Sequence, residues 1–251
     1  MLKLISLRAA LIVGMAIVTM EARLIASEAD MKLAAFFQNY LEADCQLSPM
    51  RATRLGDHRF DHLLDDVSAA AIKRRTELAR HTLKEMPRKV DYAKLSRACQ
   101  VDYEILRHDL ETGLWLDEIE RPYETDPRIY TSLATDCVYA LLTQSTLPKE
   151  MNISNAVARI RFVPGLLAAG RHNLRHPPRV VTETAIKQNK GAIAFYETDL
   201  FEMVGDTPQI ETVKKAAAVA AAALRQHQEF LERELLPRAT GNWRLGRKNY
   251  R

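Results

Sequence analysis

Glycine is scarce in this chain, and its scarcity constrains the fold more than any other feature of the sequence. Nine glycines stand among 251 residues, whereas alanine occurs 33 times. Alanine is the best helix residue and glycine is among the worst, so this balance favours helices over structures rich in tight turns. No region of the sequence is rich in strand patterns. The chain is therefore expected to be all-α, a bundle-like array of about seven helices with no sheet.

Apolar residues recur at helical spacing along most of the chain, and prolines and capping residues mark the ends of the expected helices. These helices span about residues 33–48, 68–86, 91–119, 130–142, 152–174, 182–203 and 209–236. Pro164 lies inside the fifth helix and predicts a kink there. The polar stretch between Ser48 and Asp66 is expected to be a loop with a short turn. The alanine run Ala216–Ala223 makes a narrow face, which favours a place for the last helix in the middle of the bundle.

The N-terminus has the pattern of a secretory signal peptide. Lys3 and Arg8 precede an apolar run from Ala9 to Met20, which is shorter than the roughly 20 apolar residues that a spanning helix needs. We expect residues 1–26 to be removed and residues 27–251 to form one helical domain that is exported to the periplasm or beyond the cell. No clean Ala-x-Ala cleavage site is present, so an uncleaved anchor or an apolar N-terminal helix remains the alternative. Nothing after the signal segment is expected to cross a membrane.

Charge and cysteine content exclude several classes of protein. There are 36 basic and 32 acidic side chains, so the net charge of +4 is small for this length and does not indicate a nucleic-acid partner. Cys45, Cys99 and Cys137 are widely spaced and odd in number, which excludes a disulfide framework and fits no zinc motif. They are expected to be small hydrophobic residues, and the sequence does not show whether two of them pair.

The usual enzyme motifs are absent. There is no His-Glu-x-x-His helix, no Gly-x-Ser-x-Gly elbow and no dinucleotide fingerprint. Two histidine pairs, His58/His62 and His172/His176, have the spacing that puts two imidazoles on one helical face. Zinc needs three or four ligands, and a third ligand for the first pair would have to come from a nearby aspartate. Helix capping and surface exposure explain both pairs more simply, so no metal site is expected.

The stretch from Arg51 to Asp61 is the most unusual part of the chain, because arginines, aspartates and a histidine surround one glycine. Its candidate binding residues are Arg51, Asp57, His58, Arg59 and Asp61. Arginine and carboxylate side chains at this density either bind an anionic or peptide-like group or pair with one another and fix two helices. A second basic group, Arg159, Arg161, Arg171 and Arg175, is expected to face solvent.

A series of short motifs resembles the bacterial proteins grouped as domain of unknown function 885. The most specific is Leu55-Gly-Asp-His-Arg-Phe-Asp61, which Pro49, Ala52 and Thr53 precede. Others are Asp126-Pro127, Pro177-Pro178, Thr182-Glu-Thr-Ala-Ile186 and Leu236-Pro-Arg-Ala239. The resemblance covers about residues 30–251.

Members of that family are typically more than twice as long, helical and often exported, and they look like zinc metallopeptidases. Their presumed metal motif, a His-Glu-x-x-Pro-Gly-His type of stretch, lies in the second half and matches nothing here. The resemblance thus implies an N-terminal portion, intact or truncated, with no catalytic or metal residue of its own. Zinc and a peptide-like substrate are implied for full-length members only.

The sequence leaves three hypotheses. The first is an exported, helical and catalytically inactive N-terminal portion of a metallopeptidase-like protein. The second is a non-enzymatic binding or interaction module, and the third is a metal-dependent enzyme built from His58, His62 and neighbouring carboxylates. A half-domain would leave apolar faces uncovered, so the first hypothesis predicts a large exposed apolar patch near the alanine-rich helix or the C-terminus, where a partner could bind.

Overall fold

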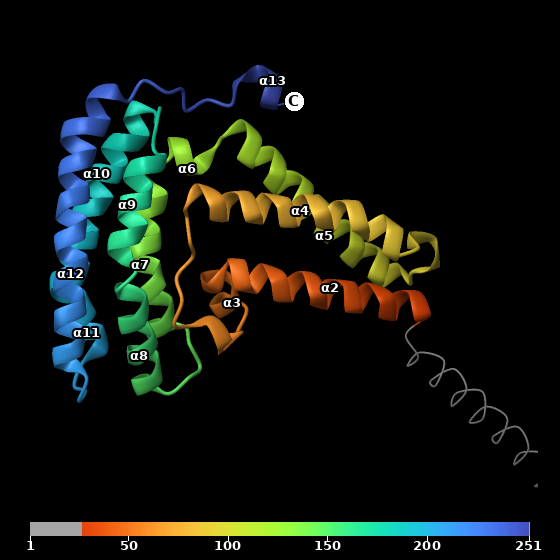
Figure 1. Cartoon of the computed structure of the whole chain (residues 1–251), viewed down its shortest axis with the longest axis horizontal. Coiled ribbons are helices and arrows are strands. Elements are labelled where there is room, and N and C mark those ends of the chain that lie inside the picture. Colours follow the sequence, from red (N-terminus) through yellow and green to blue (C-terminus); the bar gives the residue numbers. More distant parts are fainter. Residues whose placement is uncertain (1–26, 251) are drawn as a thin grey trace, which may run out of the picture. The chain divides into compact units, whose positions relative to one another are not determined.

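The computed structural model describes residues 27–250, which divide into two compact units. Unit 1 comprises the described residues up to Tyr40 together with His81–Glu111, and unit 2 comprises Leu41–Arg80 and the chain from Thr112 onward. The helices α2 (Glu28–Leu47), α4 (Ala69–Lys89) and α5 (Arg97–Ile119) each contribute residues to both units (Figure 1). Composition gave no sign of this division.

Unit 1 has a small core of its own. The core cluster is formed by Leu33, Met86, Val90, Leu95 and Tyr103, which come from α2, α4, α5 and the connection between α4 and α5. The Asp30 carboxylate on α2 accepts a hydrogen bond from the backbone N–H of Ser96 at 2.9 Å. That bond fixes the start of α5 against α2, within the same unit.

Unit 2 is a larger helical bundle. Its further helices are α3 (Pro49–Arg54), α6 (Pro122–Thr125), α7 (Arg128–Thr143), α8 (Lys149–Ile160), α9 (Val163–Asn173), α10 (Arg179–Ala194), α11 (Leu200–Val204), α12 (Ile210–Glu229) and α13 (Gly246–Tyr250). The long helices α7, α8, α9, α10 and α12 pack side by side around one core (Figure 1). Five alanines of α12 are buried, and the helix packs against α8, α9 and α10. Ala218, Val219 and Ala222 are exposed, so, contrary to the sequence prediction, α12 keeps one face to solvent and does not lie in the middle of the bundle.

The all-α prediction is confirmed. The described residues contain no strand, and their β-type pairing is limited to an isolated bridge between Pro178 and Gly241. Each of the seven expected helices has a counterpart. Within residues 27–250 no helix is long and apolar enough to cross a membrane. The expected signal peptide lies outside the described residues.

Several helix boundaries differ from the sequence prediction. The expected loop after Ser48 contains α3, because the distant Asp65 carboxylate accepts the Met50 N–H at 2.9 Å and caps the helix. The expected kinked helix 152–174 is two helices. Pro164 lies in the first turn of α9, where its missing N–H costs nothing, rather than inside a longer helix. Asp91 caps a 3₁₀ turn, and α5 begins later, after Ser96.

Two π-helical segments interrupt the C-terminal helices. Residues Phe195–Asp199 join α10 to α11, and Phe230–Leu235 continue α12. Each segment inserts a wider turn into an otherwise α-helical run, and such turns change which side chains face the core. The expected helices 182–203 and 209–236 therefore exist as continuous helical runs that are not α-helical throughout.

Candidate functional site

The charged side chains of the Arg51–Asp61 stretch pair mainly with one another and with α2. The Arg59 guanidinium contacts the carboxylates of Glu42 and Asp57, each at 2.7 Å, and Arg51 lies 3.4 Å from Asp44. These pairs hold the pKa of Glu42 and that of Asp57 below their ordinary values, because each carboxylate accepts hydrogen bonds from Arg59. A ligand would have to break these contacts before it could use the same groups.

His58 and Asp61 belong to a buried network centred on Arg159. His58 Nδ1 lies 2.8 Å from Asp61 Oδ2, and the Thr53 hydroxyl donates to Asp61 Oδ1 at 2.5 Å. The Arg159 guanidinium donates to the Leu63 carbonyl, the Cys137 carbonyl and the Thr53 hydroxyl. This arrangement matches the structural alternative, in which the stretch fixes neighbouring helices.

Arg159 corrects one sequence prediction. It was expected in a solvent-facing basic group, but its side chain is 0% exposed. A buried charge needs hydrogen-bond partners, and here each of the three guanidinium nitrogens donates to one acceptor, either a backbone carbonyl or a hydroxyl.

The residues of the metal hypothesis do not assemble into a site. His58 is committed to Asp61, and His62 is exposed. Among residues 27–250 there is no group of three or more histidine, cysteine, aspartate or glutamate side chains that could hold a metal ion. The described residues therefore do not fit the zinc that the family resemblance implies for longer proteins. The three cysteines are all free, with Cys45 and Cys137 buried.

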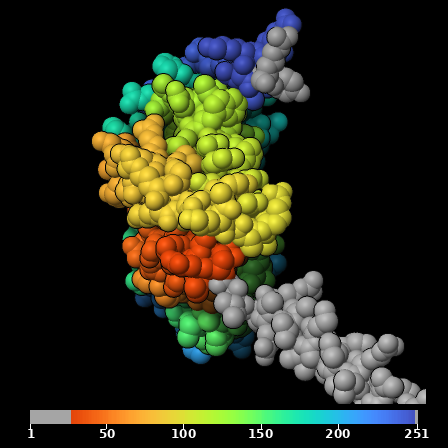
Figure 2. Space-filling model, turned by 90° about the vertical axis from the view of Figure 1, so that its right-hand side faces the viewer, coloured from red at the N-terminus to blue at the C-terminus, as the bar shows by residue number. Residues whose placement is uncertain are grey.

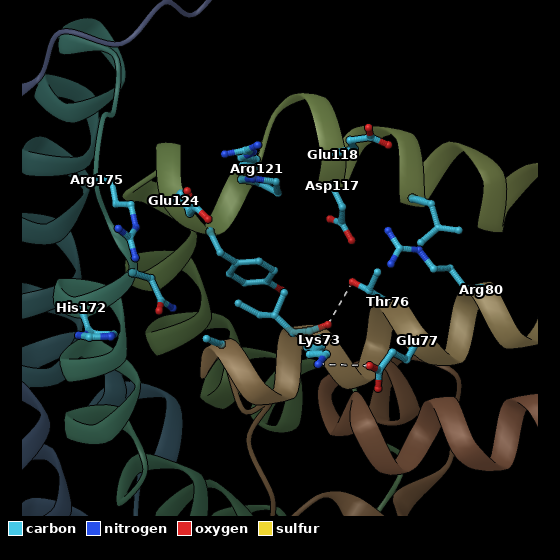
Figure 3. Close-up of a pocket in the computed structure, with 16 residues that line it drawn as sticks. Lys73, Thr76, Glu77, Arg80, Asp117, Glu118, Arg121, Glu124, His172 and Arg175 are labelled. Carbon is cyan, nitrogen blue, oxygen red and sulfur yellow. Dashed lines mark hydrogen bonds and ion pairs between the residues drawn. The ribbon is translucent and has the colours of Figure 1, made fainter.

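A pocket elsewhere in unit 2 is the better candidate site. It has a volume of about 420 Å³ and lies between the first half of α4, the end of α5, α6 and the end of α9 (Figure 3). That volume falls within the range of small-molecule sites, about 300–1,000 Å³. Ile72, Leu114 and Tyr123 supply apolar wall, and charged side chains surround it. We call this cavity the α4–α9 pocket.

Most charged side chains of the α4–α9 pocket form no ion pair with one another. Lys73 and Glu77 form an ion pair at 3.7 Å. Within the described chain, six other charged lining side chains make no ion pair or side-chain hydrogen bond: Arg80, Arg121, Arg175, Asp117, Glu118 and Glu124. Figure 3 shows Asp117 and Arg80 pointing toward the opening between α4 and α5, and Arg175 at the α9 end. Burial raises the pKa of Asp117, although the nearby Arg75 acts in the opposite direction.

The backbone of the α4–α9 pocket carries one unusual conformation. Arg121 has φ 47°, and among residues 27–250 no other residue except glycine has a positive φ. This left-handed conformation disfavours a side chain with a Cβ atom. It turns the chain from α5 into α6, where the Arg121 carbonyl accepts the N–H groups of Glu124 and Thr125.

Sequence reasoning did not find this pocket. Its lining comes from four separate segments, and each charged residue looks like an ordinary solvated helix residue. Of its charged or titratable lining residues, only His172, as half of a histidine pair, and Arg175, as part of a basic group expected to face solvent, stand out in the sequence. His172 lines the pocket and is exposed, and His176 lies outside it, so the structure does not join the two as a metal site.

A family model for bacterial proteins of unknown function, DUF885, matches residues 49–251. The chain belongs to this family. The matched region includes the Arg51–Asp61 stretch and all of the α4–α9 pocket. No curated protein matches the sequence.

A solved structure supports the fold of this DUF885 chain. It comes from Shewanella oneidensis and is described as a "putative lipoprotein of unknown function". The two share 22% sequence identity at a TM-score of 0.75, over 87% of this chain. At that identity the likeness shows the fold alone. The present chain spans about two fifths of the other protein, 41% of its length.

Proposed function

We propose that this chain is the exported, helical N-terminal region of a metallopeptidase-like DUF885 protein, and that it binds the substrate without catalysing its reaction. The observation that carries the binding role is the α4–α9 pocket, where charged groups of both signs line one cavity and most of them form no ion pair. The Arg51–Asp61 stretch has the supporting role of fixing helices, since its charges are already paired.

Activity and metal content test this proposal on the purified chain. We expect no hydrolysis of a mixture of unstructured peptides and no stoichiometric zinc after dialysis, because residues 27–250 bring no three metal-binding side chains together. Peptide hydrolysis that a chelator abolishes, together with one bound zinc per chain, would contradict it. Loss of that zinc in His58→Ala would favour the third hypothesis instead.

The genomic DNA after the codon for Arg251 tests the N-terminal-region part of the proposal. A His-Glu-x-x-Pro-Gly-His stretch in any reading frame would support it. Unrelated sequence would favour the interaction module. Export is tested separately by cell fractionation and N-terminal sequencing, with a periplasmic or secreted product beginning near residue 27 as the expected result and a full-length cytosolic product as the contrary one.

An interaction module is the second candidate, and one surface favours it. Ile119, Trp243 and Leu245 line a groove of about 380 Å³ and are 39%, 63% and 38% exposed. The surface of the C-terminal segment lies beside that of α6 in Figure 2, in dark blue and light green. Val219 on α12 is also 55% exposed, although five alanines of this helix are buried. The large exposed apolar patch that the sequence predicts, as a surface for a partner, stays a prediction.

A further inference from the structure

We infer that the α4–α9 pocket binds a small zwitterion, a molecule that carries one carboxylate and one ammonium group on an apolar body, as in an amino acid or a short peptide with free ends. The inference rests on the proposed function, because it names the ligand class of that same pocket. It is argued from two features of the pocket: charged lining side chains of both signs, and an apolar wall between them.

The charges exclude ligands of one sign. A purely anionic ligand would meet the carboxylates of Asp117, Glu118 and Glu124, of which Asp117 has a nearby cation, Arg75. A purely cationic ligand would meet Arg80, Arg121 and Arg175, which form no ion pair within the described chain. Like charges repel, so a ligand with both signs suits both sets better than a ligand with one sign.

A cation that does not line the pocket, Arg75, lies against one of its wall residues. The Arg75 guanidinium lies over the Tyr123 ring, 5.6 Å from its centroid, and donates to the Asp66 carbonyl. Its Nη2 atom is buried without a hydrogen-bond partner in the described structure. The positive charge of Arg75 also acts on the lining residue Asp117.

The apolar wall fixes what lies between the two charged ends. Ile72, Leu114 and Tyr123 come from α4, α5 and α6, so side chains of three elements offer hydrocarbon surface to one cavity. A ligand with only a carboxylate or an ammonium group would leave this apolar surface exposed to water. A ligand with aliphatic side chains between its charged ends would bury this surface, which favours binding.

Calorimetric titration of the whole chain with three matched probes tests this ligand class. Leucylleucine has both charges, N-acetyl-leucylleucine lacks the ammonium group, and leucylleucinamide lacks the carboxylate. We expect leucylleucine to bind at least tenfold more tightly than either of the other two probes, because each of those probes lacks one charged group that can form hydrogen bonds. In Asp117→Asn the preference for the free amine should fall. In Arg121→Gln and Arg175→Gln the preference for the free carboxylate should fall.

Matched controls separate recognition from folding. Glu202→Gln and Lys187→Gln change exposed charges of unit 2 outside this pocket and should keep both preferences. Thermal melting by circular dichroism confirms that each variant is folded. Equal affinity for the three probes, or unchanged preferences in folded pocket variants, overturns the inference and leaves the proposed binding role standing. Failure of all three probes to bind contradicts both.

Discussion

His227 is a histidine whose environment suits only the neutral ring. Its side chain is 0% exposed and stacks on Phe230 at 5.8 Å, and neither ring nitrogen has a hydrogen-bond partner within the described structure. Burial, and then the positive charge of Arg171, lower its pKa to about 3. The native state therefore resists protonation of this ring, whereas the unfolded chain takes up a proton near pH 6.5.

This difference predicts that His227 destabilises the protein in acid. The lowered native pKa means that stability is complete above the unfolded pKa and falls as the pH drops from about 6.5 toward 3. The slope is about 1.4 kcal/mol per pH unit, so roughly 2–3 kcal/mol is lost by pH 4.5. Urea unfolding at pH 7.5 and pH 4.5 measures the loss, which should shrink in His227→Leu. The exposed His172→Leu is the control, and an equal loss in all three proteins would contradict the assignment.

Two glycines of α9 give opposite predictions for the same substitution. A Cβ atom on Gly170 would lie 2.7 Å from the Tyr130 ring, whereas one on Gly165 meets nothing within 4 Å. Gly165→Ala should stabilise the protein by up to about 1 kcal/mol, because alanine is the better helix residue. Gly170→Ala should destabilise it by about 1–3 kcal/mol through overpacking. Chemical denaturation measures both, and stabilisation by Gly170→Ala would show that the Tyr130 ring moves freely.

At the scale of elements, Arg159 on α8 joins three other parts of unit 2. Its guanidinium donates to the Cys137 carbonyl on α7, to the Thr53 hydroxyl on α3 and to the Leu63 carbonyl after the 3₁₀ turn. Asp61 lies 3.9 Å away and is also buried. One side chain therefore sets the position of α8 against segments that are about a hundred residues earlier in the chain.

Replacing the Arg159 side chain should lower the free energy of unfolding substantially. Arg159→Met leaves the Asp61 charge buried with less compensation and removes the donor of the Leu63 carbonyl, so a loss of about 3–5 kcal/mol is expected. Urea unfolding measures it. Arg161→Met on the same stretch, where the side chain is exposed, should change stability by less than about 1 kcal/mol. Similar losses in the two variants would mean that the network contributes little.

The same elements show what sequence alone could predict. The periodic apolar stripes and prolines gave the number and order of the long helices, because those signals are local. The division between α8 and α9 was missed since Pro164 fits either a kink or the first turn of a new helix. The cap of α3 by Asp65 and the burial of Arg159 depend on partners far along the chain. The α4–α9 pocket could not be predicted either, because its lining residues come from segments that are far apart in the sequence.

At the scale of the whole molecule, the two units differ in the size of their cores. The core cluster of unit 1 contains five buried apolar side chains, of which Leu33 and Met86 are the most deeply enclosed. Unit 2 encloses a far larger set that extends over α7 to α12. Apolar burial is the main source of stability, so local opening of unit 1 should require less free energy than opening of unit 2.

Hydrogen exchange followed by mass spectrometry measures this difference. Peptides from residues 81–89 and 97–111 should exchange faster than peptides from α7 and α12, and the division should fall within α4 and α5 rather than at their ends. Leu33→Ala creates a cavity in the smaller core, so it should speed exchange in unit 1 while leaving α12 unchanged. Val138→Ala, in the core of unit 2, is the reciprocal control. If both variants speed exchange equally throughout the described chain, the two units unfold as one cooperative structure, and the continuity of α2, α4 and α5 outweighs the separation of the cores.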